Sequence, residues 1–365
     1  MNGSRSFLFL LMFLLVFSFS SQAQKPATPK LIWKINRIDL GTILEEQGLQ
    51  QAEFEFTVAQ DSSFHIDQVI AECGCTSVDY TRDTLSKGQT GKLVLSFDPS
   101  LAAGFFSKLV VVKGDFGAIQ DSLFLEGTSI PYPSNLDRAY PVKIGQLGFR
   151  LKKINMGDVF DNEPKVKYVE FFNFGEELLE KIKFTFKAPE YIKMEQVQEF
   201  VRSQERGLIK ITYNSKIKND LGFFEDEVSL GWKSNLSDQI NLQVLADLFE
   251  FFPPISKDQL EEVPQLLIQQ KVIDLREISS TSIVRRQVTI SNLGKKVLEI
   301  RKIQGNCECL TIESPKDTLE PGESIQLNLV FDPKGRKGID QRNIYLFTND
   351  PVNPVQLIIL KSRIE

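Results

Sequence analysis

Two Cys-X-Cys segments carry the most distinctive reactive groups of this 365-residue chain. The four cysteines fall into two pairs, Cys73 with Cys75 and Cys307 with Cys309, and one residue separates the members of each pair. On an extended strand, residues i and i+2 point to the same face, so each pair would present two sulfurs side by side. Four interpretations compete: buried small apolar side chains, a local disulfide, a redox pair or a metal site.

The first two interpretations are favoured over the redox one. Exported proteins meet an oxidising compartment, where a disulfide within each pair can form. Reactive thiols need an electropositive setting, whereas Glu72 lies beside the first pair and Glu308 lies inside the second. These carboxylates disfavour the thiolate form.

A metal site is disfavoured by the number of ligands. Two sulfurs satisfy a linear Cu(I) site at most, and structural zinc needs four ligands. Cys73, Cys75, Cys307 and Cys309 therefore remain weak metal candidates and possible disulfide or redox pairs. Because Glu308 takes the place of Gly74, the middle position cannot require left-handed backbone. We expect extended or mildly turned backbone at both sites.

Little else in the sequence suggests catalysis. The single histidine, His65, is expected to be a solvated side chain, because a catalytic base needs a nucleophile and an orienting partner within reach. The sequence contains no G-x-S-x-G, P-loop or H-E-x-x-H motif. We predict a non-enzyme with no catalytic residue and no cofactor. The net charge of −5 argues against nucleic acid as a partner.

The sequence around the cysteine pairs is repeated. Cys73-Gly74-Cys75 lies 234 residues before Cys307-Glu308-Cys309, and Phe97-Asp98-Pro99 stands at the same distance before Phe331-Asp332-Pro333. No gap is needed over this stretch, so the two ends of the chain are copies of one domain. Half of that spacing predicts a third copy in the middle, and Asn173-Phe174-Gly175 supports it by its likeness to Asn292-Leu293-Gly294.

Within each copy the apolar residues alternate with polar ones. Leu93, Leu95 and Phe97 form one such series, which is typical of a strand with one buried face. Short strands separated by regular turn signals indicate an all-β fold. We therefore predict three tandem immunoglobulin-like β-sandwich domains after a cleaved signal peptide.

The expected domain limits follow from the repeat and from the proline-rich joints. A basic residue, the apolar run 7–17 and small residues before position 24 predict a signal peptide over residues 1–23. The apolar run is shorter than the ~20 residues that cross a bilayer, so we expect no membrane span in the mature chain. The further expected segments are domain 1 (24–131), domain 2 without cysteine (132–250), a linker (251–267) and domain 3 (268–365).

The sequence resembles a family of exported bacterial domains of unknown function built around a Cys-Gly-Cys-Thr segment. That family is related to ASH (hydin-like) and major-sperm-protein-like immunoglobulin folds. The resemblance is carried by Cys73-Gly74-Cys75-Thr76, Asn292-Leu293-Gly294, Pro321-Gly322-Glu323 and Thr348-Asn349-Asp350-Pro351. It covers the two outer thirds of the chain well, and it implies an Ig-like sandwich used mainly for protein contact.

These observations predict an exported scaffold of the bacterial envelope. We expect it in the periplasm, associated with the outer membrane or at the cell surface. Its expected partners are other envelope proteins, including an outer-membrane complex of which it would be an accessory subunit. Exposed sheet edges and end loops would make the contacts. The alternative is an envelope thiol-disulfide or Cu(I)-handling protein that acts through the Cys-X-Cys pairs.

Overall fold

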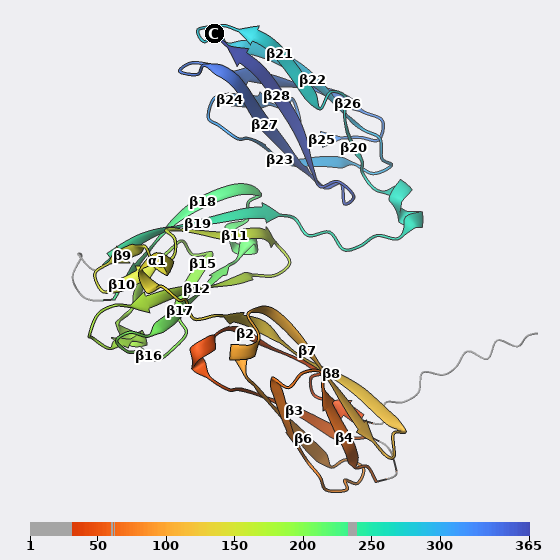
Figure 1. Cartoon of the computed structure of the whole chain (residues 1–365). Coiled ribbons are helices and arrows are strands. Elements are labelled where there is room, and N and C mark those ends of the chain that lie inside the picture. Colours follow the sequence, from red (N-terminus) through yellow and green to blue (C-terminus); the bar gives the residue numbers. More distant parts are fainter. Residues whose placement is uncertain (1–30, 60, 62, 233–238) are drawn as a thin grey trace, which may run out of the picture. The chain divides into compact units, whose positions relative to one another are not determined.

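The computed structural model describes residues 31–365 apart from residues 60, 62 and 233–238 (Figure 1). The chain forms two compact units, Met1–Tyr132 and Pro133–Glu365. The expected signal peptide, residues 1–23, lies outside the described residues. Three separate apolar cores define three sandwiches, one in the first unit and two in the second. The predicted all-β fold of tandem Ig-like sandwiches is confirmed.

The first sandwich has two four-stranded sheets, of order β1-β3-β6-β5 and β2-β8-β7-β4. On β6, Leu93, Leu95 and Phe97 are fully buried between the sheets, as the alternation predicts. The strands are β1 (Leu31–Trp33), β2 (Arg37–Leu44), β3 (Gln50–Val58), β4 (Ile66–Ala71), β5 (Thr76–Tyr80), β6 (Thr90–Phe97), β7 (Gly104–Gly114) and β8 (Ile119–Ile130).

The second sandwich has sheets of order β15-β17-β12-β10-β9 and β11-β19-β18-β14, with a small sheet of β13 and β16. A buried ion pair joins Arg206 to Glu170, at 3.1 Å, on neighbouring strands. The strands are β9 (Val142–Ile144), β10 (Leu147–Phe149), β11 (Lys153–Phe160), β12 (Lys165–Asn173), β13 (Leu179–Glu180), β14 (Thr185–Lys187), β15 (Ile192–Gln196), β16 (Phe200–Val201), β17 (Arg206–Tyr213), β18 (Gly222–Gly231) and β19 (Gln239–Phe249).

The third sandwich repeats the topology of the first, with sheets of order β20-β22-β26-β24 and β21-β28-β27-β23-β25. Its strands are β20 (Leu266–Ile268), β21 (Val272–Ile278), β22 (Val284–Asn292), β23 (Leu298–Gly305), β24 (Leu310–Glu313), β25 (Thr318–Leu319), β26 (Ser324–Phe331), β27 (Gly338–Thr348) and β28 (Val355–Ile364). Its core is again formed by the inward-facing residues of both sheets.

One local turn recurs in all three sandwiches. Each contains a parallel strand pair, β2 with β8, β11 with β19 and β21 with β28, whose register shifts at the same place. At that shift a residue of positive φ donates its N–H to an Asp or Asn side chain two residues earlier. The donors and acceptors are Gly41 to Asp39, Gly157 to Asn155 and Arg276 to Asp274. Two glycines meet this demand freely, whereas Arg276 meets it at a cost.

Helical segments are short and connect strands. They are the 3-10 turns η1 (Glu45–Gln47), η2 (Pro99–Leu101), η3 (Lys181–Lys183) and η5 (Lys257–Glu262) and the single-turn helices α1 (Leu136–Ala139) and α2 (Ser215–Lys218). Within the described residues, no helix is long and apolar enough to cross a membrane.

Candidate functional site

Each Cys-X-Cys segment lies at the turn where the chain crosses from one sheet of its sandwich to the other. The first follows β4 and precedes β5, and the second lies between β23 and β24. The pairs are therefore not on extended strands, and the expected side-by-side arrangement on one strand face is wrong. The expected backbone was extended or mildly turned, and the structure has the turned form. Neither Gly74 nor Glu308 has positive φ.

A disulfide closes each turn. It joins Cys73 to Cys75 and Cys307 to Cys309, with Cα atoms 5.3 and 5.2 Å apart. Two residues along an extended strand advance by about 6.6 Å, near the upper limit for a disulfide, so the turn shortens the Cα–Cα distance toward the value of about 5.5–6 Å that is most common. The backbone helps, because the residue after each pair donates its N–H to the carbonyl of the first cysteine at 3.3 Å.

The disulfides pack against the ends of the two cores. Cys75 is buried, and the other three cysteines are half-buried against apolar neighbours. In both copies the second cysteine's carbonyl accepts a 2.9 Å bond from the aspartate that follows β6 or β26. This arrangement fixes the crossing between sheets. Among the described residues, no cluster of three or more His, Cys, Asp or Glu side chains is placed to hold a metal ion.

His65 lies between two carboxylates beside the turn of the β7–β8 hairpin. Its Nε2 is 2.7 Å from Asp67 Oδ1, and its Nδ1 is 3.8 Å from Asp115 Oδ1. The ring also makes an edge contact with Phe116, with centroids 5.3 Å apart. These neighbours orient the imidazole beside the hairpin turn. The equivalent residues of the third sandwich, Glu299 and Arg301, also pair with each other, so the carboxylate lies on the other member of the pair in that copy.

The tip of the same hairpin is a feature that the sequence reasoning missed. Phe116 is 95% exposed, and both Asp115 and Phe116 adopt positive φ, at 50° and 56°. Gly117 donates its N–H to the carbonyl of Gly114 at 3.1 Å, which closes a tight turn of the type I′ kind. That turn favours glycine at its second central position, so the phenylalanine there is unusual once the turn type is known, and the sequence alone gave no signal of it.

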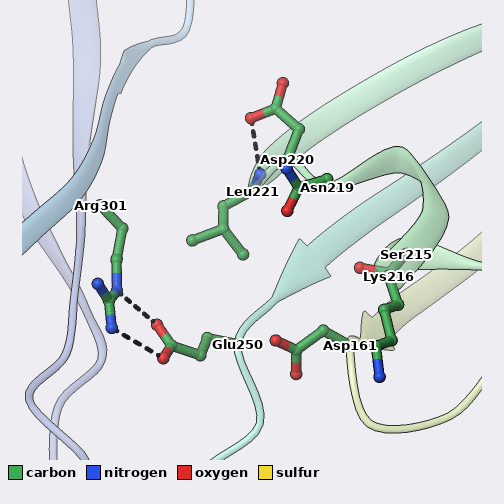
Figure 2. Close-up of a pocket in the computed structure, with 8 residues that line it drawn as sticks. All are labelled: Asp161, Ser215, Lys216, Asn219, Asp220, Leu221, Glu250 and Arg301. Carbon is green, nitrogen blue, oxygen red and sulfur yellow. Dashed lines mark hydrogen bonds and ion pairs between the residues drawn. The ribbon is translucent and has the colours of Figure 1, made fainter.

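A polar cavity of about 360 Å³ lies where the second sandwich meets the third (Figure 2). The guanidinium of Arg301 binds both carboxylate oxygens of Glu250, at 3.0 and 3.2 Å, and this hydrogen bonding raises the pKa of Arg301. Ser215 is buried and its hydroxyl is unpaired. The lining residues are Asp161, Ser215, Lys216, Asn219, Asp220, Leu221, Glu250 and Arg301. This set is polar and charged, with Leu221 as its one aliphatic residue.

The joint beside this cavity is built around Phe223, the second residue of β18. Gln304 of the third sandwich accepts the Phe223 N–H at 2.9 Å and donates to its carbonyl at 3.2 Å. The Phe223 ring meets Tyr345 edge-on at 4.6 Å and lies 6.1 Å from Phe347. Lys302 adds an ion pair to Asp220 at 2.7 Å. The third sandwich thus receives the beginning of β18, a strand of the second sandwich, on the outer face of its sheet.

Comparison with known proteins places both cysteine-containing sandwiches in one family. The family described as "Protein of unknown function (DUF1573)" matches residues 31–129 and 266–362, which together make up more than half of the chain. No protein with a curated description matches the sequence.

Solved structures with a similar fold have low sequence identity. A protein of unknown function from Porphyromonas gingivalis W83 is 15% identical, with a TM-score of 0.44, and the match covers 60% of this chain and 100% of that one. The ASH/PapD-like domain 7 of human CEP192 is 9% identical, with a TM-score of 0.25, over 32% of this chain and 93% of that domain. Titin domains I67–I69 are 10% identical, with a TM-score of 0.20, over 93% and 100% of the two chains.

Proposed function

The chain belongs to the DUF1573 family of proteins of unknown function, and from this premise we propose that it is an exported, non-enzymatic scaffold that binds other proteins of the bacterial envelope. Its Ig-like sandwiches fit a role in protein contact, because a rigid β core can hold loops and sheet edges in fixed positions. The finer part of the proposal is a place in the periplasm or at the outer membrane, as an accessory subunit of an assembly there.

The exposed phenylalanine at the β7–β8 tip carries this proposal. Phe116 places an aromatic ring in solvent from a backbone conformation that costs a non-glycine residue about 1–2 kcal/mol. A residue kept at such a cost, against the preference of the turn, points to selection for the side chain itself. Rigid exposed aromatics are common anchors of protein interfaces. We therefore assign Phe116 as a contact residue for the envelope partner.

Photo-crosslinking from this tip tests the proposal. A photoreactive amino acid at position 116, introduced into the chain in living cells, is expected to capture a discrete envelope protein. The matched control is position 182, because Ile182 is 88% exposed on the second sandwich. If position 116 yields only the products that position 182 yields, the protein-contact role of the tip is refuted. Separating the membranes of the same cells tests the outer-membrane part of the proposal.

The alternative proposal, thiol-disulfide exchange or Cu(I) handling, rests on the recurrence of the Cys-X-Cys disulfide in the two outer sandwiches and not in the second. Replacing all four cysteines by serine discriminates between the two roles. Under the scaffold role, binding is lost only in so far as the fold is destabilised. A copper or redox phenotype with the fold and the crosslink intact would favour the alternative instead.

A further inference from the structure

A buried position of the second sandwich is polar where both outer sandwiches have proline. Ser215 follows the strand β17, and the corresponding residues after β6 and β26 are Pro99 and Pro333. All three are buried. In each copy the preceding Asn or Asp caps the turn by accepting a backbone N–H two or three residues later. Proline suits the position after such a cap, because no N–H is needed there. The serine is therefore an exception that the shared turn does not require.

This serine has a hydroxyl without a partner. Ser215 is 2% exposed, and its Oγ makes no hydrogen bond within the described part of the chain. A buried hydroxyl without a hydrogen bond costs free energy that a proline at the same place does not. Ser215 lines the cavity of about 360 Å³ at the joint, and Figure 2 shows its oxygen on the cavity side. A ligand in the cavity would supply the missing partner.

Other polar groups of the cavity are also available to a ligand. Within the described residues, the side chains of Lys216 and Asn219 have no hydrogen bond or ion pair. Asp161 accepts the Phe251 N–H with one oxygen, at 2.8 Å, and its second oxygen has lone pairs to spare. Figure 2 shows these side chains around the same space. The cavity thus offers both donors and acceptors of hydrogen bonds.

The charges around the cavity nearly cancel. Ion pairs from Arg301 and Lys302 of the third sandwich neutralise the carboxylates of two lining residues, Glu250 and Asp220. The other ionised groups of the lining are one carboxylate and one ammonium. A site without excess charge does not concentrate ions of either sign. It suits a neutral ligand that both donates and accepts hydrogen bonds, and hydroxyl groups do both.

Two exposed aromatic residues adjoin lining residues in the sequence. Phe160 precedes Asp161, and Phe251 follows Glu250. Each phenylalanine is 42% exposed, and the two rings meet edge-on with centroids 6.4 Å apart. Small-molecule sites commonly combine aromatic side chains with a few polar groups. A sugar matches this combination, because it carries hydroxyl groups and, on the faces of its ring, C–H groups that pack on aromatic rings.

We propose that the cavity between the second and third sandwiches binds a neutral sugar unit of an envelope glycan, with a sugar hydroxyl paired to Ser215. Its volume of about 360 Å³ lies at the lower end of the range of small-molecule sites, about 300–1,000 Å³. N-acetylated sugars of the cell wall and hexoses of surface polysaccharides share this hydroxyl chemistry. The inference goes beyond the proposed protein contact, and its failure would leave the Phe116 crosslink untouched.

Saturation-transfer difference NMR tests the site on the chain from residue 24 onward. The probes are D-glucose, D-galactose, D-mannose, L-fucose and N,N′-diacetylchitobiose, with the zwitterion glycine as the control. At least one sugar should bind with a Kd of about 1 mM or lower, and glycine should not bind. Binding of the chitobiose alone indicates the cell-wall source, and binding of a hexose or fucose indicates the polysaccharide source. The proposal is overturned if none of the sugars binds at about 10 mM, or if glycine binds as well as they do.

Two serine variants separate ligand binding from a structural role. Ser215→Ala should weaken sugar affinity about tenfold or more without lowering the urea midpoint, because the hydroxyl has no protein partner to lose. The matched control is Ser129→Ala in the first sandwich, where an equally buried hydroxyl donates to the Pro99 carbonyl at 3.1 Å. It should lower the urea midpoint and leave sugar affinity unchanged. Ser215→Pro, the residue of the outer copies, should also lose the sugar. Full sugar affinity in Ser215→Ala overturns the assignment.

Discussion

Replacing Phe116 by glycine is expected to separate binding from stability. The ring is 95% exposed, so its removal uncovers almost no core. Its backbone has φ of +56°, which glycine adopts without steric cost. The variant should therefore lose partner contact while the first sandwich stays fully folded. Most substitutions of an interface residue leave the free energy of unfolding unchanged or lower it, so an increase in this variant would be informative.

Comparison with Phe116→Ala isolates the backbone contribution. Both variants remove the ring and its edge contact with His65. Alanine keeps the left-handed cost of about 1–2 kcal/mol, whereas glycine removes it and loses about 0.5–1 kcal/mol more in backbone entropy. The free energy of unfolding of Phe116→Gly should thus exceed that of Phe116→Ala by about 0.5–1 kcal/mol. For a domain of this size, that is a rise in melting temperature of about 2–8 °C.

Urea unfolding followed by Trp33 fluorescence measures this difference. Trp33 reports on the first sandwich, where its indole N–H donates to Asp121 at 3.0 Å, and a shared Trp232→Phe background removes the signal of the second sandwich. Equal stability of the glycine and alanine variants would refute the reasoning from backbone strain. Retained crosslinking or co-purification in the glycine variant would refute the assignment of Phe116 as a contact residue.

Three further predictions concern stability. Arg276→Gly should stabilise the third sandwich by about 0.5–1 kcal/mol, measured as a higher urea midpoint, because the exposed Arg276 has a φ of +60° where the other sandwiches carry glycine; a lower midpoint would contradict this. Glu170→Ala should cost about 3–5 kcal/mol in the second sandwich, since it removes a carboxylate that pairs with the buried Arg206, whereas Glu170→Leu with Arg206→Leu should cost far less; equal losses would refute the buried-pair argument. Burial raises the pKa of Asp226, but hydrogen bonds from Lys218 and two tyrosines outweigh it and lower that pKa. The stability that this lowered pKa provides is therefore fully present above the ordinary pKa of about 3.9 and is lost as pH falls through the lower folded value. Asp226→Asn should therefore flatten the acid side of a plot of urea midpoint against pH.

The sequence predicted what depends on periodicity and on repeats. The alternation of Leu93, Leu95 and Phe97 fixes which face of β6 is buried, because a shift by one residue would expose the whole series. The exact spacing between the two Cys-X-Cys segments predicts that the outer sandwiches share one topology. Both signals come from many residues acting together, so single substitutions do not obscure them.

What the sequence did not reveal depends on local backbone conformation. A Cys-X-Cys pair is compatible with a strand or a turn, and only the sheet-to-sheet crossing after β4 and β23 selects the turn. Arg276 gives no sign of its positive φ, because the requirement comes from Asp274 and the register shift of β21 on β28. Phe116 was equally hidden, since an Asp-Phe-Gly sequence reads as an ordinary loop until its dihedral angles are known.

The places where the three copies diverge indicate which surfaces carry function. The buried alternation and the Asp or Asn turn at the parallel strand pair recur in each sandwich, because each must close the same core. The residues that change sign lie on the outer faces: Asp67 for Arg301, and Arg336 for Asp220. These two positions belong to different ion pairs of the joint, because Arg301 pairs with Glu250 and Asp220 pairs with Lys302. The charged contacts of this joint are therefore particular to the second and third sandwiches, whereas the core and the Asp or Asn turn are common to all three.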